Sequence, residues 1–159
     1  MMCKNVSKEQ IISNIRDSRQ TPEGFIPREN EIDINDWELE CDDKGDIIAQ
    51  GNLYSNKGDW YSCTIQKLYV HPAFRGKGIG KNIVKRLINK AKTRKDKGMD
   101  DCQILTADVD RNNVASRDLF EKMGFKIRET FCIPGENKKA DVLRMSLTRL
   151  RGCGASNGI

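Results

Sequence analysis

The sequence has no run of apolar residues as long as the ~18 that a membrane-spanning helix needs. Residues 1–10 are polar and lack the apolar segment of a secretory signal. The chain also has a single histidine, His71, and none of its six cysteines belongs to a Cys-x-x-Cys pair. We therefore expect a cytoplasmic protein with no metal site and with free thiols. The six cysteines are Cys3, Cys41, Cys63, Cys102, Cys132 and Cys153.

The length and composition are those of one globular domain. The 159 residues fall within the roughly 100–200 residues of a typical domain, and such a chain can bury a core without disulfides or metals. Residues 151–159 hold three glycines, and chain ends of this kind are often poorly ordered. We expect a single domain over residues 1–150 and a flexible tail over residues 151–159.

Charge is distributed unevenly along the chain. The formal net charge is only +5, but residues 29–43 hold eight acidic and no basic residues, whereas residues 77–97 are strongly basic. Charge runs are usually solvated surface, and we favour that interpretation of the acidic run. The alternative is an acidic rim that attracts a cationic partner. The basic segment lacks the interleaved aromatics typical of nucleic-acid binding, so we expect no nucleic-acid partner.

The spacing of apolar residues predicts strands and helices in a mixed order. Helices are expected over residues 7–19, 81–95 and 114–123, and strands over residues 37–41, 47–54, 60–70, 103–109, 125–131 and 141–147. Ser7 is the expected N-cap of the first helix. This order predicts an α/β fold in which helices pack on a mixed sheet.

The most informative stretch joins the strand over residues 60–70 to the helix that follows. It reads Arg75-Gly76-Lys77-Gly78-Ile79-Gly80. Its glycines let a ligand approach the backbone, and the start of a helix offers unpaired N–H groups with a partial positive charge. Together these features predict a phosphate site, to which Arg75, Lys77 and Lys81 add charge. The Walker A and dinucleotide patterns both fail here, because the three glycines are evenly spaced by two.

This loop resembles the Arg/Gln-x-x-Gly-x-Gly/Ala loop of the GNAT superfamily of acyl-CoA N-acyltransferases. The preceding residues 68–74, Leu-Tyr-Val-His-Pro-Ala-Phe, are similar to the strand and turn of that family. The resemblance implies a GNAT-like fold of about six or seven mostly antiparallel strands flanked by about four helices. It also implies that the loop binds the pyrophosphate of acetyl-CoA while the strand lies beside the pantetheine arm.

A second segment supports the same family. Residues 113–125, Asn-Val-Ala-Ser-Arg-Asp-Leu-Phe-Glu-Lys-Met-Gly-Phe, resemble the family's Asn-x-x-Ala-x-x-Leu-Tyr-x-x-x-Gly-Phe segment, although the alanine lies one place earlier here. The cofactor-binding residues that the two resemblances imply are Leu68, Tyr69, Val70, Arg75, Gly76, Lys77, Gly78, Ile79, Gly80, Lys81, Asn113, Ser116 and Phe120.

The resemblance implies an N-acetyltransferase that acts by direct attack of a primary amine on the thioester. Its oxyanion donor would be the backbone amide of Val70. The family's proton-donating tyrosine falls at Phe120, which has no proton to give, and a glutamate found in some members falls at Thr64. Asp108 is a candidate base; Glu38, Glu40, His71 and a water chain are alternatives. The proton donor is equally open among solvent, Tyr54, Tyr61 and Tyr69.

Three further questions stay open at this point: the acceptor, the oligomeric state and the function itself. The acceptor could be a small-molecule amine or a protein amine, and the family's frequent dimerisation makes a homodimer an option. A CoA-binding sensor or regulatory module with little catalysis is the main alternative function, because Phe120 and Thr64 depart from the family pattern. A nucleic-acid-binding protein is a third option, and it predicts strongly salt-dependent binding.

Overall fold

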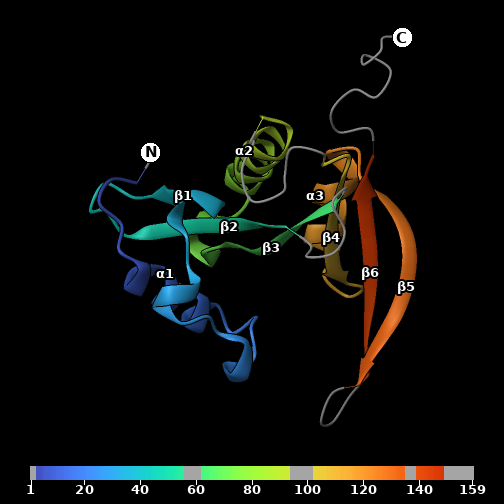
Figure 1. Cartoon of the computed structure of the whole chain (residues 1–159), viewed down its shortest axis with the longest axis horizontal. Helices are drawn as coiled ribbons and strands as arrows, with labels where there is room; N and C mark the ends of the chain where they lie inside the picture. The colour runs from blue at the N-terminus through green and yellow to red at the C-terminus, as the bar shows by residue number, and fades with distance from the viewer. Residues whose placement is uncertain (1–2, 56–61, 94–101, 135–138, 149–159) are drawn as a thin grey trace. The chain divides into compact units, whose positions relative to one another are not determined.

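The computed structural model describes residues 3–55, 62–93, 102–134 and 139–148 (Figure 1). The first two residues of the strand expected over 60–70, the last two of the helix expected over 81–95 and the tail over 151–159 lie outside these residues. The chain divides into two compact units. Unit 1 comprises Met1–Leu53 and Lys67–Leu87, and unit 2 comprises Tyr54–Gln66 and Ile88–Ile159. The single domain over residues 1–150 stays a prediction.

The predicted α/β fold is confirmed. Six strands form one sheet in the order β1-β2-β3-β4-β6-β5, with β3 and β4 parallel and the pairs β1–β2, β4–β6 and β5–β6 antiparallel. The strands are β1 (Trp37–Cys41), β2 (Ile47–Ser55), β3 (Ser62–Val70), β4 (Ile104–Asp110), β5 (Lys126–Pro134) and β6 (Lys139–Leu147).

The described ranges contain three α-helices, where the resemblance implied about four. These are α1 (Lys8–Ser18), α2 (Ile79–Thr93) and α3 (Val114–Lys122). The segment between α1 and β1 forms short 3-10 turns instead, η1 (Glu23–Phe25), η2 (Glu29–Glu31) and η3 (Ile34–Asp36). Pro22, Gly24 and Pro27 explain this difference, because proline and glycine interrupt α-helix. None of the helices described is both long and apolar enough to cross a bilayer.

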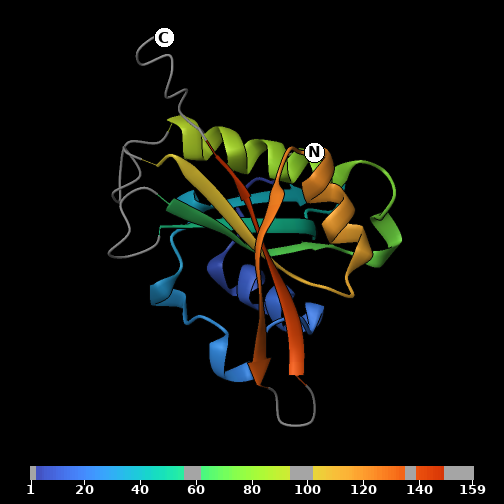
Figure 2. The same ribbon diagram turned by 90° about the vertical axis from the view of Figure 1, so that its right-hand side faces the viewer.

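In unit 1, α1 and α2 cover opposite faces of the strands. Figures 1 and 2 both place α1 on one side of β1 and β2 and the start of α2 on the other. Ser7 caps α1 as predicted, in a capping box with Gln10. Ile11 and Ile15 face inward from α1 and pack with Ile32 and Trp37. The apolar side of α2 is buried equally well, so both helices are held by burial of one stripe.

Two cysteines of unit 1 correct the expectation of free thiols. Cys3 and Cys41 form a disulfide, with their Cα atoms 5.1 Å apart. Cys41 ends β1 and Cys3 precedes α1, so only the folded path of the chain brings them within disulfide distance. Cys63 and Cys102 are free and buried, as expected. The side chains of Cys132 and Cys153 lie outside the described structure.

In unit 2, the core follows the alternation of β4. Leu105, Ala107 and Val109 are buried on one face of this strand. β5 and β6 form a long antiparallel hairpin, and β6 pairs with β4 (Figure 2). Met145 of β6 is fully buried, and Phe120 of α3 is almost so. Residues far apart in sequence therefore meet on β4 and β6.

Candidate active site

The loop between β3 and α2 has the open backbone that the sequence predicts. His71 caps η4 (Pro72–Phe74), since its Nδ1 accepts the N–H of Ala73 at 3.3 Å. Gly76 and Gly78 follow with φ of +79° and +81°, a region that favours glycine. A Cβ added at either position would meet no atom within 4 Å. The loop therefore leaves space where a ligand can approach the main chain.

The start of α2 supplies hydrogen-bond donors to this loop. Its first intrahelical bond runs from the N–H of Asn82 to the carbonyl of Gly78, at 3.1 Å. The N–H groups of Ile79, Gly80 and Lys81 come before it, so they have no intrahelical partner. The Lys81 side chain is exposed in the same first turn. Amides, a helix dipole and a cation at one place fit a diphosphate.

Two of the predicted cationic side chains turn back onto the protein. The Arg75 Nε donates to the carbonyl of Val70 at 2.9 Å, and its guanidinium lies 5.6 Å from the centre of the Tyr69 ring. The Lys77 Nζ lies 5.4 Å from the centre of the Phe74 ring. Arg75 therefore contacts the end of β3, which leaves the backbone amides as the main candidate anion-binding groups of the loop.

In unit 2, β3 and β4 separate at a defined point. Their parallel register ends with Ile65 opposite Ala107, whereas β4 continues alongside β6 to Asp110. Asp108 is thus the first residue of β4 beyond its last partner on β3. The candidate base therefore lies where β4 no longer pairs with β3.

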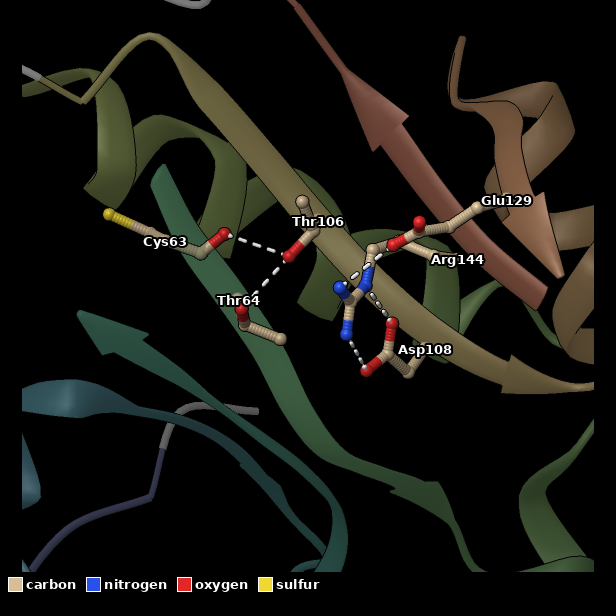
Figure 3. Close-up of polar contacts among 6 residues, drawn as sticks. All are labelled: Cys63, Thr64, Thr106, Asp108, Glu129 and Arg144. Atoms are coloured by element: carbon tan, nitrogen blue, oxygen red, sulfur yellow. Dashed lines mark hydrogen bonds and ion pairs between the residues drawn. The ribbon is translucent and has the colours of Figure 1, made fainter. Parts of the chain in front are cut away.

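Thr64 joins β3 to β4 instead of acting as a base. Its Oγ1 lies 2.8 Å from the Oγ1 of Thr106, and that hydroxyl also contacts the carbonyl of Cys63 at 3.3 Å (Figure 3). The residues sit one step before the strands separate. The pair is a cross-strand link of a kind that stabilises sheets.

Asp108 belongs to an ion-pair cluster with Arg144 and Glu129 (Figure 3). Arg144 donates to both carboxylate oxygens of Asp108, at 2.9 and 3.1 Å, and to Glu129 at 2.9 Å. The hydrogen bond with Asp108 raises the pKa of Arg144 above its usual value, assisted by both negative charges. The guanidinium also lies 5.1 Å from the centre of the Phe131 ring. Arg144 therefore fixes the orientation of the Asp108 carboxylate.

The cluster was not predicted from the sequence, because no motif marks it. Asp108 and Arg144 are 36 residues apart, and only the antiparallel register of β4 and β6 places them opposite each other. The signal available was weak: each strand carries one charged residue between apolar neighbours, Asp108 between Ala107 and Val109 and Arg144 between Leu143 and Met145.

The hairpin glutamates named as alternative bases are engaged elsewhere. Glu38 and Glu40 of β1 form ion pairs with Arg86 of α2, at 3.5 and 3.1 Å. They therefore link the first strand to α2.

Lys67 of β3 has an unusual backbone and an unusual pKa. It is a non-glycine residue with φ of +53°, and burial lowers the pKa of its ammonium group.

The second predicted motif forms the start and core side of α3. The Oδ1 of Asn113 accepts the N–H of Ser116 at 3.1 Å, so Asn113 is the N-cap. Phe120 is 3% exposed, and its ring packs edge-on against Phe125 at 5.0 Å between centroids. A packing role for Phe120 fits this environment.

Within the residues described, no three histidine, cysteine or acidic side chains gather as a metal site would require.

The fold is that of an α/β protein in which two parallel strands stop pairing and an open glycine loop leads into a helix. The family model for the "Acetyltransferase (GNAT) family" matches residues 12–125. The chain therefore belongs to the GNAT acetyltransferase family, as the motifs predicted.

Individual relatives agree with this assignment. The L-amino acid N-acyltransferase MnaT of Escherichia coli K12 is 33% identical over 82 residues, which cover 46% of this chain and 43% of that protein. The match thus spans less than half of the curated relative. The ribosomal-protein-alanine N-acetyltransferase of Brucella melitensis superposes with a TM-score of 0.70 at 16% identity, covering 93% of this chain and 98% of the other. The yncA protein of Salmonella typhimurium, solved with its cofactor acetyl-CoA, gives 0.63 at 17% identity over 89% and 85%.

Proposed function

We propose that this chain transfers the acetyl group of acetyl-CoA to a primary amine. The observation that carries the proposal is the loop after β3, where Gly76 and Gly78 leave open space beside the first amides of α2. A diphosphate fits that arrangement. Lys81 would add charge, and the backbone of Leu68, Tyr69 and Val70 would accompany the pantetheine arm.

The reaction requires a neutral amine, a stabilised oxyanion and a protonated leaving thiol. The amine nitrogen bonds to the thioester carbonyl carbon, the C–S bond breaks, and the amine gives up one proton. An alkyl amine of pKa ~10.4 is neutral in only about one molecule in 10³ near pH 7. In this proposal the backbone N–H of Val70 donates to the oxyanion, which is usually the largest electrostatic contribution.

We assign the role of base to Asp108. Arg144 uses two of the ~four lone-pair positions of a carboxylate, so the others can accept a proton from the amine or from a bridging water. Arg144 is then a positioning residue, since it holds the carboxylate in one orientation. Such a base typically contributes ~10²–10⁴ in rate.

Protonation of the leaving thiolate falls to another group than the family's tyrosine. Phe120 is buried against Phe125 and carries no proton. A thiol of pKa ~8.5 is a fair leaving group, so solvent suffices in this proposal. Tyr54 and Tyr69 are the alternatives within the described residues, and Tyr61 lies outside them.

The direct test measures thiol release from acetyl-CoA with a panel of primary amines, alongside thermal unfolding with CoA. Amine-dependent thiol release together with a higher Tm in CoA supports the proposal. A higher Tm without turnover favours the sensor or regulatory module. The buried Phe120 and the Thr64 that is hydrogen-bonded to Thr106 would suit such a module. If millimolar CoA leaves the Tm unchanged, both the N-acetyltransferase and the CoA-binding module are overturned.

A further inference from the structure

The disulfide between Cys3 and Cys41 closes a loop around one apolar cluster of unit 1. The two cysteines are 38 residues apart. Of the described residues in this cluster, Ile47 alone lies outside the loop. The members inside it are Val6, Ile11, Ile12, Ile15, Ile26, Ile32, Trp37 and Leu39. The enclosed segment therefore packs mainly on itself, which is the property of a part that opens separately from the rest of a protein.

The enclosed segment joins the sheet through β1, which is a short strand. β1 has five residues and lies at the edge of the described sheet, beside β2. Its register with β2 shifts between Glu40 and Cys41. An edge strand has a partner strand on one side only, so its pairing opens more readily than that of a central strand. The disulfide thus holds β1 at the end where its pairing is irregular.

The residues just before Cys41 also hold α2. The guanidinium of Arg86 forms ion pairs with Glu38 and Glu40, at 3.5 and 3.1 Å, and donates to the carbonyl of Leu39 at 3.3 Å. The paired side chains are 19–30% exposed, so solvent screens them only in part. Arg86 lies about two turns after the start of α2. A displacement of β1 therefore reaches the helix whose first amides are the candidate anion-binding groups.

A second contact limits how far that effect extends. A Cβ added at Gly51 of β2 would lie 3.1 Å from the Cδ1 of Leu87 and 3.3 Å from the Cγ2 of Ile83. These two side chains of α2 thus pack directly on the β2 backbone. Loss of the Arg86 contacts should therefore loosen α2 without detaching it, and the effect on the glycine loop should be graded.

The disulfide is accessible from one side. Cys3 is half-buried, whereas Cys41 is 4% exposed. A thiolate of a dithiol reagent attacks the Sγ of Cys3, and the Sγ of Cys41 leaves and takes up a proton. The second thiolate of the reagent then displaces Cys3, which is protonated in turn. The protein disulfide gains two electrons and two protons, and the reagent is oxidised to a cyclic disulfide.

We propose that the Cys3–Cys41 disulfide is a redox switch: a dithiol that reduces it releases residues 3–41 from the sheet and, through Arg86, weakens CoA binding at the glycine loop. The disulfide is the element with two states, and both sites act on it. The coupling to CoA rests on the proposed function, whereas the release of the segment does not.

Hydrogen exchange followed by mass spectrometry tests the release, with dithiothreitol as the reductant. A digest of unreduced protein should contain Cys3 and Cys41 in one cross-linked peptide. Reduction should accelerate the exchange of α1 by up to about 10³-fold, the closure entropy of a loop of this length. In the reduced protein the exchange of α1 should depend little on low urea, as local opening does, and the exchange of β4 should keep the steep dependence of global unfolding. Cys3→Ser is the control, and it should exchange at the reduced rate with or without the reagent.

Calorimetry with CoA tests the coupling. The Kd for CoA should rise about fivefold on reduction, at the lower end of typical coupling between two sites. Because coupling is reciprocal, saturating CoA should raise the ratio of reduced to oxidised dithiothreitol needed for half-reduction by the same factor. Arg86→Gln should have the same Kd in both redox states. Lys85→Gln, at the neighbouring exposed position of α2, is the matched control and should keep the fivefold difference.

Each part of the proposal has a result that overturns it. Absence of the cross-linked peptide removes the switch. If α1 and β4 accelerate together with the same dependence on urea, reduction only lowers global stability and no segment is released. Equal Kd values in the two redox states of wild-type protein overturn the regulation of CoA binding while the proposed function stands, and a difference that persists in Arg86→Gln overturns the role of Arg86. If CoA binds neither form, the proposed function and the coupling both fail, and the exchange of α1 still decides the release.

Discussion

The glycine loop over residues 75–80 and the acidic segment over residues 29–43 are both in unit 1, yet they use charge in opposite ways. The loop offers backbone N–H groups, and the guanidinium of Arg75 donates a hydrogen bond to the carbonyl of Val70 at the end of β3. The acidic segment gives much of its charge to local structure: Glu38 and Glu40 pair with Arg86, and Asp42 accepts N–H groups in the β1–β2 turn. Formal charge along a sequence therefore says little about a site until the partners are known.

The largest expected effect is the loss of CoA binding in Gly78→Glu. Gly78 has positive φ and open space around its missing Cβ, so a glutamate would enter the space that a diphosphate needs and add negative charge there. We expect the Kd for CoA to rise by about 10³-fold, as calorimetry would measure, given the loss of several charge-assisted hydrogen bonds.

Gly45→Glu is the control for this change. Gly45 has φ of +87° and nothing within 4 Å of its missing Cβ, but it lies in the β1–β2 turn. Both variants should lose a similar ~1 kcal/mol of stability from the strained φ, and only Gly78→Glu should lose CoA. Equal CoA affinity in the two variants would remove the loop from the proposed function.

The second largest expected effect is the loss of stability when the Cys3–Cys41 disulfide, which anchors the acidic segment, is removed. The disulfide from Cys3 to Cys41 spans 38 residues and encloses α1 and most of residues 29–43. The chain-entropy estimate for a loop of this length is about 4 kcal/mol, so Cys3→Ser should lower the free energy of unfolding by up to that amount. Urea unfolding monitored at Trp37, which packs beside α1, would measure it.

Reduction provides the matched comparison. Wild-type protein in dithiothreitol should unfold at the same urea concentration as Cys3→Ser, and Cys3→Ser should not respond to the reductant. If wild-type stability is the same with and without reductant, the disulfide makes no contribution and the acidic segment is held by packing alone.

The fold was predictable to the extent that its signals are local. The capping box of Ser7, the turn at Asp42 and the apolar stripe of α2 depend on residues within a few positions of each other, so the elements begin and end close to where the spacing placed them. The disulfide was not predictable, because a separation of 38 residues is closed only by tertiary structure. The short 3-10 turns before β1 also escaped prediction, since their three-residue length leaves no periodicity.

A third prediction addresses the base. Asp108→Asn keeps the shape of the side chain but removes its capacity to take a proton, so kcat should fall by about 10²-fold near pH 7. The loss should shrink as the pH rises toward the pKa of the acceptor amine, because a larger fraction of the amine is then already neutral. A pH series of kcat with one amine would measure both effects.

Glu129→Gln is the control for that substitution. Glu129 contacts the same guanidinium at 2.9 Å, but Arg144 keeps its two bonds to Asp108 when Glu129 is changed. We expect less than about threefold loss of kcat, which is the scale of an exposed ion pair. Equal losses in the two variants would mean that the cluster is only structural.

In the candidate site, as in the fold, local features were predictable from the sequence and features that depend on tertiary structure were not. The open geometry of the loop was predictable because the glycines and the helix start are consecutive in the sequence, and a short motif encodes them; that its amides bind phosphate stays a proposal. Arg144 and Thr106 were not predictable, because each gains its role from a neighbouring strand.

The smallest expected effect belongs to Lys67, a cation that burial penalises, unlike the exposed lysines of α2. Burial lowers the pKa of Lys67 below the usual 10.5, so the folded state binds this proton less tightly than the unfolded state does. The penalty is complete below the lowered pKa and is relieved as the pH rises through the window up to 10.5. Lys67→Met should therefore raise the Tm at pH 7 by about 1–2 °C, a small gain because solvent still screens the group. The advantage should shrink by pH 10, whereas Lys85→Met, at an exposed position of α2, should differ from wild type at neither pH. A gain that persists unchanged at pH 10 would assign the effect to packing, since only a titrating ammonium predicts the decrease.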